Sequence, residues 1–404
     1  MVLTAYEGLW PWRDLFPHHA TLFDADADCR RVRTGPEVSC GGPWSSPCFD
    51  RSRCRRGGGG GGGSGRLSVY VHDDECSMRT SSEIVAGYKG TAVPHLWTEA
   101  AEEVRNIAAS RGLLVETIEG ACIVFYAVPP RGECVSKTPT WNRGQNHVLI
   151  DFNDASRDTH RSLDAKAMFA QSNMRPCYYR FGYDIAVPLR ARQAFPGMRK
   201  TAPLDRKYFA TFKARARGAA ARPLLDEELP SSSSSADETV VVVEQCEERY
   251  HEHVSQLSWN KDLCRSKKKD FVEAASYGDL MNTTFALLPS GRSPATYRLA
   301  EALSAGALPV FVLQDFVKPF PDLIPWSEFS FTFPAEEAPY IMDTLRAVPR
   351  EKLAEMQATA LKVFDEFFGW GMQGTMHTVL NILEDRLRYR ARNRRSQKTR
   401  RRRQ

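Results

Sequence analysis

The sequence has little of what membrane-spanning or zinc-binding chains carry. Its 404 residues contain no run of about eighteen apolar residues, so this chain by itself is not expected to span a membrane. Residues 1–20 lack a basic stretch ahead of an apolar core, which is unlike a signal peptide. None of the ten cysteines stands in a close CxxC pair or near histidines at zinc spacing. The pattern favours disulfides, and therefore a luminal compartment, over a zinc site.

Charge is concentrated at one end of the chain. The formal net charge is +6, but residues 386–404 hold eleven Lys or Arg and no acid, so the remainder is mildly acidic. We predict that 389–404 is a disordered basic tail. No aromatic residues interleave the basic run as in single-strand binders, so we expect no nucleic-acid partner.

Apolar runs and helical spacing alternate along the chain, which indicates an α/β protein of two domains. The boundaries we expect are 1–65 (a cysteine-rich segment and a glycine linker), 66–205, 206–370, a return helix at 371–388 and the basic tail. Ser231–Ser235 is predicted as an exposed loop. In the first domain we predict strands at 66–71, 121–128, 148–152 and 185–188, and helices at 95–111 and 164–171.

Residues 284–313 form the most informative stretch. An apolar strand, Phe285–Leu288, runs into a turn at 289–291, and Ser293 is placed to cap a helix that begins at Pro294. The helix is expected to end at Gly306, before a second apolar strand at 308–313. This order predicts a parallel strand pair with the helix N-terminus at the carboxyl ends of the strands, where nucleotide phosphates bind.

Charged side chains accompany that helix start. Arg292 lies in the turn, and Arg298 and Glu301 share one helix face. A guanidinium fork can hold a diphosphate, and a carboxylate can accept hydrogen bonds from ribose hydroxyls. An exposed ion pair on an ordinary helix is the alternative.

These residues resemble the exostosin glycosyltransferases. PSGRSPATYRLAEAL at 289–303 is similar to their PRGR…S-x-R-x-x-EAL segment, and GALPVFV…PF…W continues it. Further segments that resemble the family in order are CFDRSRC (48–54), RLSVYVHDD (66–74), WNRGQNHVLIDFND (141–154), FGYDIAVPL (181–189) and FDEFF (364–368). The resemblance covers about residues 40–388 and is to the amino-terminal transferase domain of the heparan-sulfate exostosins and their plant relatives.

The resemblance implies an α/β fold of the GT-B type, with two Rossmann-like domains facing across a cleft. The second domain would hold a UDP-sugar co-substrate through Gly291, Arg292, Thr296, Arg298 and Glu301, with no metal and no cofactor. Family members are typically Golgi type II membrane proteins, so we expect a Golgi lumenal domain, membrane-associated through an anchor outside this chain. The sequon at Asn282 fits a luminal chain.

The family inverts the anomeric carbon, which requires a general base beside the acceptor hydroxyl and positive charge at the departing diphosphate. Arg298 would serve the diphosphate, and Asp154 is our first choice of base, with Asp151 and Asp158 as alternatives. Each of these aspartates also suits a turn. We interpret His147 as a structural histidine. Phe320 and Trp326 either line the donor pocket or belong to the core.

We therefore expect a glycosyltransferase that uses UDP-glucuronate or, next, UDP-galactose or UDP-arabinose, with a polysaccharide or glycoprotein glycan as acceptor. Ser290 stands where the exostosins have arginine, and the loop at 155–162 differs from theirs. These departures leave a second interpretation open, a noncatalytic partner subunit that pairs with another exostosin-like chain. A homodimer or heterodimer is compatible with both interpretations.

Overall fold

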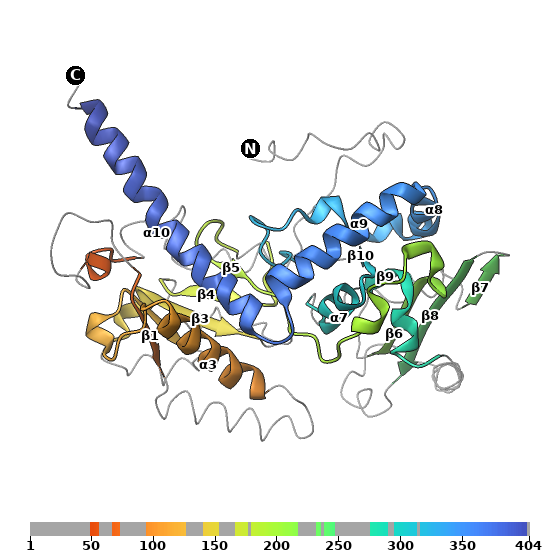
Figure 1. Cartoon of the computed structure of the whole chain (residues 1–404), viewed down its shortest axis with the longest axis horizontal. Helices are drawn as coiled ribbons and strands as arrows, with labels where there is room; N and C mark the ends of the chain where they lie inside the picture. Colours follow the sequence, from red (N-terminus) through yellow and green to blue (C-terminus); the bar gives the residue numbers. More distant parts are fainter. Residues whose placement is uncertain are drawn as a thin grey trace. The chain divides into compact units, whose positions relative to one another are not determined.

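The chain folds around two mainly parallel β-sheets, drawn in Figure 1 from a computed structural model. The structure describes residues 49–55, 67–72, 94–126, 140–152, 166–176, 179–216, 232–235, 238–246, 275–289, 295–312 and 316–401. All of these belong to one unit, residues 38–404. The glycine linker and most of the cysteine-rich segment lie outside the described residues.

The first sheet contains five described strands that are all parallel to their neighbours, in the order β1-β2-β3-β4-β5. Every residue of β2, β3 and β4 is buried, as expected for a parallel sheet covered on both faces. The strands are β1 (Val69–His72), β2 (Ile123–Tyr126), β3 (His147–Asp151), β4 (Met168–Gln171) and β5 (Ile185–Ala186). Helix α3 (Pro94–Ser110) buries the apolar stripe that the sequence predicted, including Val104 and Ile107.

The predicted helix at 164–171 is wrong. Its second half forms β4, which pairs with β3 over Met168–Gln171. Ala, Lys, Met and Gln favour helices when taken locally, but complete burial between two parallel neighbours overrides that preference. Strand β4 therefore forms because it pairs with β3 and β5, against its local preference for a helix.

The second sheet contains six described strands in the order β11-β10-β9-β6-β8-β7. Only β7 among these is antiparallel to its neighbour. The strands are β6 (Tyr208–Ala216), β7 (Ser232–Ser235), β8 (Glu238–Cys246), β9 (Thr283–Pro289), β10 (Leu308–Val312) and β11 (Phe331–Phe333). Residues 232–235 of the predicted loop thus form a short edge strand, and Ser231 lies outside the described residues. A polar tetrapeptide carries no strand periodicity, so its pairing with β8 could not be predicted from sequence.

Helices complete the second half of the chain and return to the first. They are α7 (Tyr297–Ala305), α8 (Ile341–Arg346), α9 (Arg350–Val363), the π-helical turn η11 (Phe364–Phe368) and α10 (Gln373–Arg401). Short 3₁₀ turns are η2 (Arg53–Arg55), η3 (Ile118–Gly120), η4 (Asn142–Gly144), η5 (Pro196–Met198), η6 (Pro203–Asp205), η8 (Asp279–Met281), η9 (Trp326–Glu328) and η10 (Ala335–Tyr340). None of the described helices is long and apolar enough to cross a membrane.

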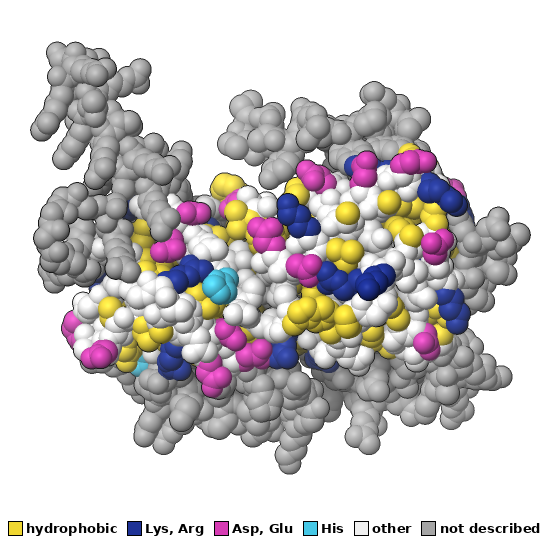
Figure 2. All heavy atoms as spheres, in the orientation of Figure 1, with side chains coloured by type: hydrophobic (Ala, Val, Ile, Leu, Met, Phe, Trp, Pro, Cys, Tyr) yellow, Lys and Arg dark blue, Asp and Glu magenta, His cyan; other side chains and the backbone are white. Residues whose placement is uncertain are grey.

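Helix α10 runs further than predicted. We expected disorder from residue 389, but the helix continues to Arg401. Arg, Lys and Gln are good helix formers, and no Gly or Pro follows residue 374 to stop the helix. On the face drawn in Figure 2, acidic and basic side chains are interspersed, so no extended patch of one sign covers the described part of that face.

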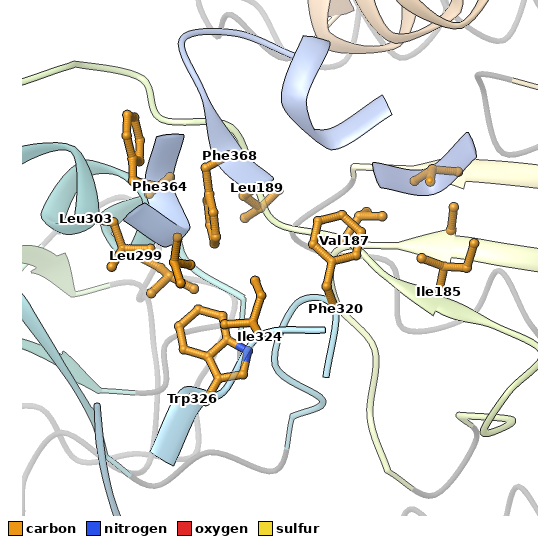
Figure 3. Close-up of a cluster of buried hydrophobic side chains, with 14 of the residues drawn as sticks. Ile185, Val187, Leu189, Leu299, Leu303, Phe320, Ile324, Trp326, Phe364 and Phe368 are labelled. Atoms are coloured by element: carbon orange, nitrogen blue, oxygen red, sulfur yellow. The ribbon is translucent and has the colours of Figure 1, made fainter. Parts of the chain in front are cut away.

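A continuous apolar core joins the two sheets. Val187 and Leu189, which follow β5, belong to the same buried cluster as Leu299 and Leu303 of α7, and Phe320 lies beside Val187 (Figure 3). Ile324, Trp326, Phe364 and Phe368 complete this part of the core. Phe320 and Trp326 are therefore core residues, and the pocket interpretation of these two is not supported. The backbone continues the link, because Val317 N–H donates to Met174 O and Phe320 N–H to Ala186 O, both at 2.8 Å.

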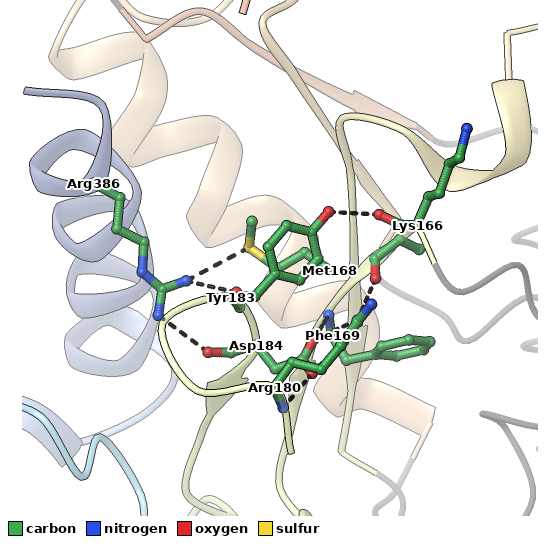
Figure 4. A network of polar contacts seen from close by, with 8 residues as sticks. Lys166, Met168, Phe169, Arg180, Tyr183, Asp184 and Arg386 are labelled. Atoms are coloured by element: carbon green, nitrogen blue, oxygen red, sulfur yellow. Dashed lines mark hydrogen bonds and ion pairs between the residues drawn. The ribbon is translucent and has the colours of Figure 1, made fainter. Parts of the chain in front are cut away.

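A half-buried arginine of α10 links this helix to the residues that precede β5 of the first sheet (Figure 4). Arg386 of α10 donates to the carbonyl oxygens of Tyr183 (2.6 Å) and Asp184 (3.1 Å). The Asp184 carboxylate in turn binds Arg180 through two hydrogen bonds of 2.8 and 2.6 Å. Arg386 therefore links α10 to the first half of the chain.

The segment WNRGQNH has a structural explanation. Asn146 adopts φ 63° and links the amino-terminal segment to β2, because its side-chain amide donates to the carbonyl oxygens of Asp50 and Cys122. At Gly144, with φ +80°, a Cβ would lie only 2.7 Å from the Ala167 backbone nitrogen. A disulfide between Cys54 and Cys122 closes the same junction, in line with the prediction of disulfides in preference to a zinc site.

The two sheets and their helices form two Rossmann-like halves, the α/β architecture of the GT-B type that the sequence predicted.

Candidate functional site

The strand, helix and strand predicted at 284–313 are present as β9, α7 and β10. Strands β9 and β10 are parallel, with Phe285 opposite Leu308, and Gly306 ends α7 at φ 73°. The predicted start of the helix is wrong, since α7 begins at Tyr297 and Thr296 is its N-cap. Thr296 has the extended backbone that a cap requires, and its Oγ1 accepts from Arg298 N–H at 3.3 Å. Ser290, Gly291, Arg292, Ser293 and Pro294 lie outside the described residues.

Arg298 projects from the first turn of α7 onto the carboxyl-terminal half of β6. Its Nη2 donates to the Lys213 carbonyl oxygen, and its side chain is only 6% exposed. The guanidinium carbon lies 4.8 Å from the Phe212 ring centre and 4.9 Å from that of Tyr277. Nη1 is buried and has no hydrogen-bond partner among the described residues. Nη1 therefore keeps a hydrogen-bond donor that none of the described residues uses.

Glu301, one turn further along α7, is also buried, at 4% exposure. Its Oε1 accepts from the backbone N–H groups of Arg192 (3.2 Å) and Gln193 (3.3 Å), which lie in the connection between the two halves. Its Oε2 accepts from the Tyr277 hydroxyl. Burial of both Arg298 and Glu301 argues against the exposed surface ion pair that was the alternative interpretation.

The remaining acceptor capacity of Glu301 is limited. A carboxylate offers about four acceptor positions, and three are already used by protein donors. We expected this residue to receive two ribose hydroxyls, whereas the geometry leaves room for about one. Arg298 and Glu301 together suit a ligand with an anionic group next to a hydroxyl-bearing ring.

Asp151 is the described member of the three candidate bases. It ends β3, is buried, and accepts a hydrogen bond of 3.0 Å from Gln171 Nε2 at the end of β4. Asp154 and Asp158 lie outside the described residues. The structure thus places one aspartate at the carboxyl edge of the first sheet, where ligands of open α/β sheets bind.

His147 is buried among aromatic rings, as the structural interpretation expects. Its ring centre lies 4.9 Å from that of Trp141 and 5.7 Å from that of Tyr126. Nδ1 lies 2.8 Å from Gln145 O, and because a carbonyl only accepts, Nδ1 carries the proton. Burial lowers the pKa of His147 from 6.5 to about 4, so the ring is neutral at physiological pH.

Two further residues, both in contact with elements of the second half, were not identified from the sequence. Tyr277 touches both Arg298 and Glu301, although it precedes them by a strand and a turn. Lys318 lies 4.6 Å above the Phe311 ring of β10 and donates to Thr332 Oγ1 at 2.7 Å. Burial lowers the pKa of Lys318 to about 8. An aromatic residue before an apolar strand was the signal for Tyr277, but an isolated tyrosine is too common to select.

Metal binding was not expected here. Within the described ranges, no cluster of three or more His, Cys, Asp or Glu side chains is arranged to hold a metal ion. Independence from metals stays a prediction.

Two Rossmann-like halves, the second with a buried Arg and Glu on the helix between two parallel strands, define the α/β architecture of the GT-B class. The family model of the exostosin GT47 domain matches residues 100–348. The chain therefore belongs to the exostosin GT47 family, as the sequence motifs predicted.

Similar proteins include Exostosin-2 of Mus musculus, which is 24% identical over 363 residues, covering 84% of this chain and 46% of that protein. Exostosin-1 of Drosophila melanogaster is 25% identical over 273 residues, covering 64% of this chain and 34% of that protein. The chain thus spans about half or less of the length of these relatives. Among solved structures, WaaG, a glycosyltransferase involved in lipopolysaccharide biosynthesis, is 12% identical with a TM-score of 0.33, covering 75% of this chain and 95% of that chain. The family assignment rests on the sequence match.

Proposed function

We propose that the chain is an inverting glycosyltransferase that moves a sugar from a UDP-sugar to a polysaccharide or glycoprotein glycan. The observation that carries this proposal is the buried Arg298 and Glu301 at the start of α7, in a chain of the GT47 family. UDP-glucuronate is the first donor to test, followed by UDP-galactose and UDP-arabinose.

The reaction would be a single displacement. The acceptor oxygen attacks the anomeric carbon, the bond to the diphosphate breaks, and a carboxylate takes the acceptor proton. Arg298 Nη1 would stabilise the charge that develops on the departing UDP. No metal enters this scheme. Asp154 stays our proposed base, and Asp151, at the end of β3, is the alternative within the described residues.

A noncatalytic partner subunit remains the second candidate. It is favoured by Ser290, which replaces a cation near the expected diphosphate, and by the three protein donors that already occupy Glu301. For both candidates we propose a Golgi lumenal location. The Cys54–Cys122 disulfide supports an oxidising compartment.

Calorimetry with the full chain tests the donor site. UDP and the three UDP-sugars are titrated into the wild type, Arg298→Ala, Glu301→Ala and Arg346→Ala. The last is a matched control, because Arg346 is an α8 residue in an ion pair with Asp343 that is largely exposed. We expect binding that is lost in the first two variants and kept in the third. Absence of binding to every UDP compound would refute the donor site and leave the partner subunit as the better candidate.

Transfer is then tested separately. The sugar that binds best is offered with oligosaccharide acceptors, and the anomeric configuration of the product is determined by NMR. Inversion supports the mechanism, whereas retention or hydrolysis alone contradicts it. Asp154→Asn and Asp151→Asn, assayed side by side, distinguish the two candidate bases.

A further inference from the structure

Tyr277 is the residue that contacts both charged side chains of the candidate site. It lies in the turn before η8, half-buried. Its hydroxyl donates to Glu301 Oε2, and its ring centre lies 4.9 Å from the Arg298 guanidinium carbon. Burial raises the pKa of the Tyr277 hydroxyl above its ordinary value, so it remains a donor at any working pH.

The opposite side of Glu301 is held independently. The connection between the two halves follows α7 along residues 192–195. Arg192 and Gln193 donate to Glu301 Oε1, and Phe195 N–H donates to Ser304 Oγ at 3.2 Å. Because the carboxylate is held at both oxygens, its remaining acceptor position points in one direction only.

Arg298 is confined in the same manner. Phe212 of β6 and Tyr277 lie at similar distances from the guanidinium carbon, 4.8 and 4.9 Å, and Nη2 is held by the Lys213 carbonyl oxygen. Removal of the Tyr277 ring would leave Arg298 with the Phe212 ring and this one hydrogen bond. The orientation of Nη1, the nitrogen without a partner among the described residues, would then be less well determined.

We infer that Tyr277 is a positioning residue of the donor site, whose hydroxyl directs Glu301 to a ribose hydroxyl and whose ring directs Arg298 to the diphosphate. The inference rests on the proposed function, because it assigns a role within the same donor site. It predicts that the Tyr277 hydroxyl affects binding of the ribose and that the Tyr277 ring affects binding of the diphosphate. Substitutions that remove only one of these groups should therefore have different effects.

The hydroxyl is tested with Tyr277→Phe. Calorimetry measures the affinities of the wild type and the variant for UDP, 2′-deoxy-UDP and 3′-deoxy-UDP. A hydrogen bond to a charged group is worth about tenfold or more in affinity, so the wild type should lose about tenfold for one of the deoxy ligands. In Tyr277→Phe that penalty should fall to about twofold or less, because Glu301 is no longer directed to the missing hydroxyl.

The ring is tested with Tyr277→Leu. Contact between a guanidinium and an aromatic face contributes about three- to tenfold in affinity. The preference for UDP over uridine should therefore fall by about that factor, while uridine binding stays close to that of Tyr277→Phe. Tyr183→Phe is the matched control, since it also removes a hydroxyl that donates to a protein acceptor, Lys166 O at 2.6 Å, but in the first half.

The outcomes separate the two proposals. A wild type that binds no UDP refutes the proposed function and, with it, this inference. A wild type that binds UDP but tolerates both deoxy ligands, or a Tyr277→Phe variant that weakens all ligands equally, overturns the positioning role alone. Melting temperatures of the variants identify a general loss of folding, and Tyr183→Phe should leave every ligand ratio unchanged.

Discussion

The stability of this protein should decrease on acidification because of one buried histidine. His147 is 1% exposed, its Nδ1 proton is donated to Gln145 O, and its Nε2 has no hydrogen-bond partner among the described residues. A second proton would have to be placed on Nε2 without an acceptor. Burial therefore lowers the pKa of His147 from 6.5 to about 4, and nearby Arg53 and His72 add to this effect.

The sign of the effect follows from linkage. The unfolded chain protonates His147 below pH 6.5, whereas the folded chain does so only below about pH 4. The contribution of His147 to the free energy of unfolding is therefore fully present above pH 6.5 and is lost as the pH falls toward 4. The loss amounts to about 2 kcal/mol at pH 5 and about 3 kcal/mol at pH 4.

Urea unfolding, followed by tryptophan fluorescence, measures this loss between pH 7.5 and 5. His147→Gln is the comparison, because glutamine does not titrate and all other groups are common to both proteins. The wild type should lose about 2 kcal/mol more than His147→Gln over this interval, even though the variant is less stable at neutral pH. Parallel losses in the two proteins would refute the reasoning.

Three other perturbations test the fold. Arg386→Ala deletes two hydrogen bonds from a half-buried guanidinium to backbone carbonyls and should cost about 3 kcal/mol, seen as a lower melting temperature. An unchanged melting temperature would mean that apolar contacts alone hold α10. Gly306→Ala places a Cβ 3.1 Å from Leu361 Cδ2 at φ +73°, and we expect a loss of about 1 kcal/mol or more in urea unfolding, whereas a gain would contradict the left-handed cap. Reduction, or the Cys54→Ser variant, opens a loop with a sequence separation of 68 and should cost about 4 kcal/mol by loop entropy; equal melting temperatures with and without reductant would show that the bond is not formed in solution.

The elements that could be predicted are those whose conformation depends on residues close to them in the sequence. Strand β9, helix α7 and strand β10 follow from an apolar run, a helical stripe and a terminal glycine, each of which acts within a few residues. Strand β4 was not predicted, because its conformation depends on pairing with β3, and the local sequence does not indicate that pairing. The helical end of α10 was missed for the opposite reason, since composition suggested disorder while helix propensity sufficed to extend the helix.

The candidate site also contains residues that the sequence indicates and residues that only the structure identifies. Arg298 and Glu301 were found because they stand three residues apart in one motif. The groups that hold them were not, because Arg192 lies 109 residues from Glu301, and Lys213 lies 85 residues from Arg298. Asn146 shows the same limit: its motif was recognised by resemblance, but its link to the amino-terminal segment spans 96 residues. The spacing of residues along the sequence identifies charged pairs such as Arg298 and Glu301, whereas the groups that orient their side chains are found only in the folded structure.

The shared core has a practical consequence for domain exchange. A chimera that joined the first half of this chain to the second half of a relative at a cut near residue 206 would separate Val187 and Leu189 from Leu299, Phe320 and Phe368. Mismatched volumes at such a junction would leave voids or overlaps in a buried region. An exchange of donor specificity would therefore work better with a smaller graft, from β9 to the end of α7, that leaves 316–326 and η11 with their original partners.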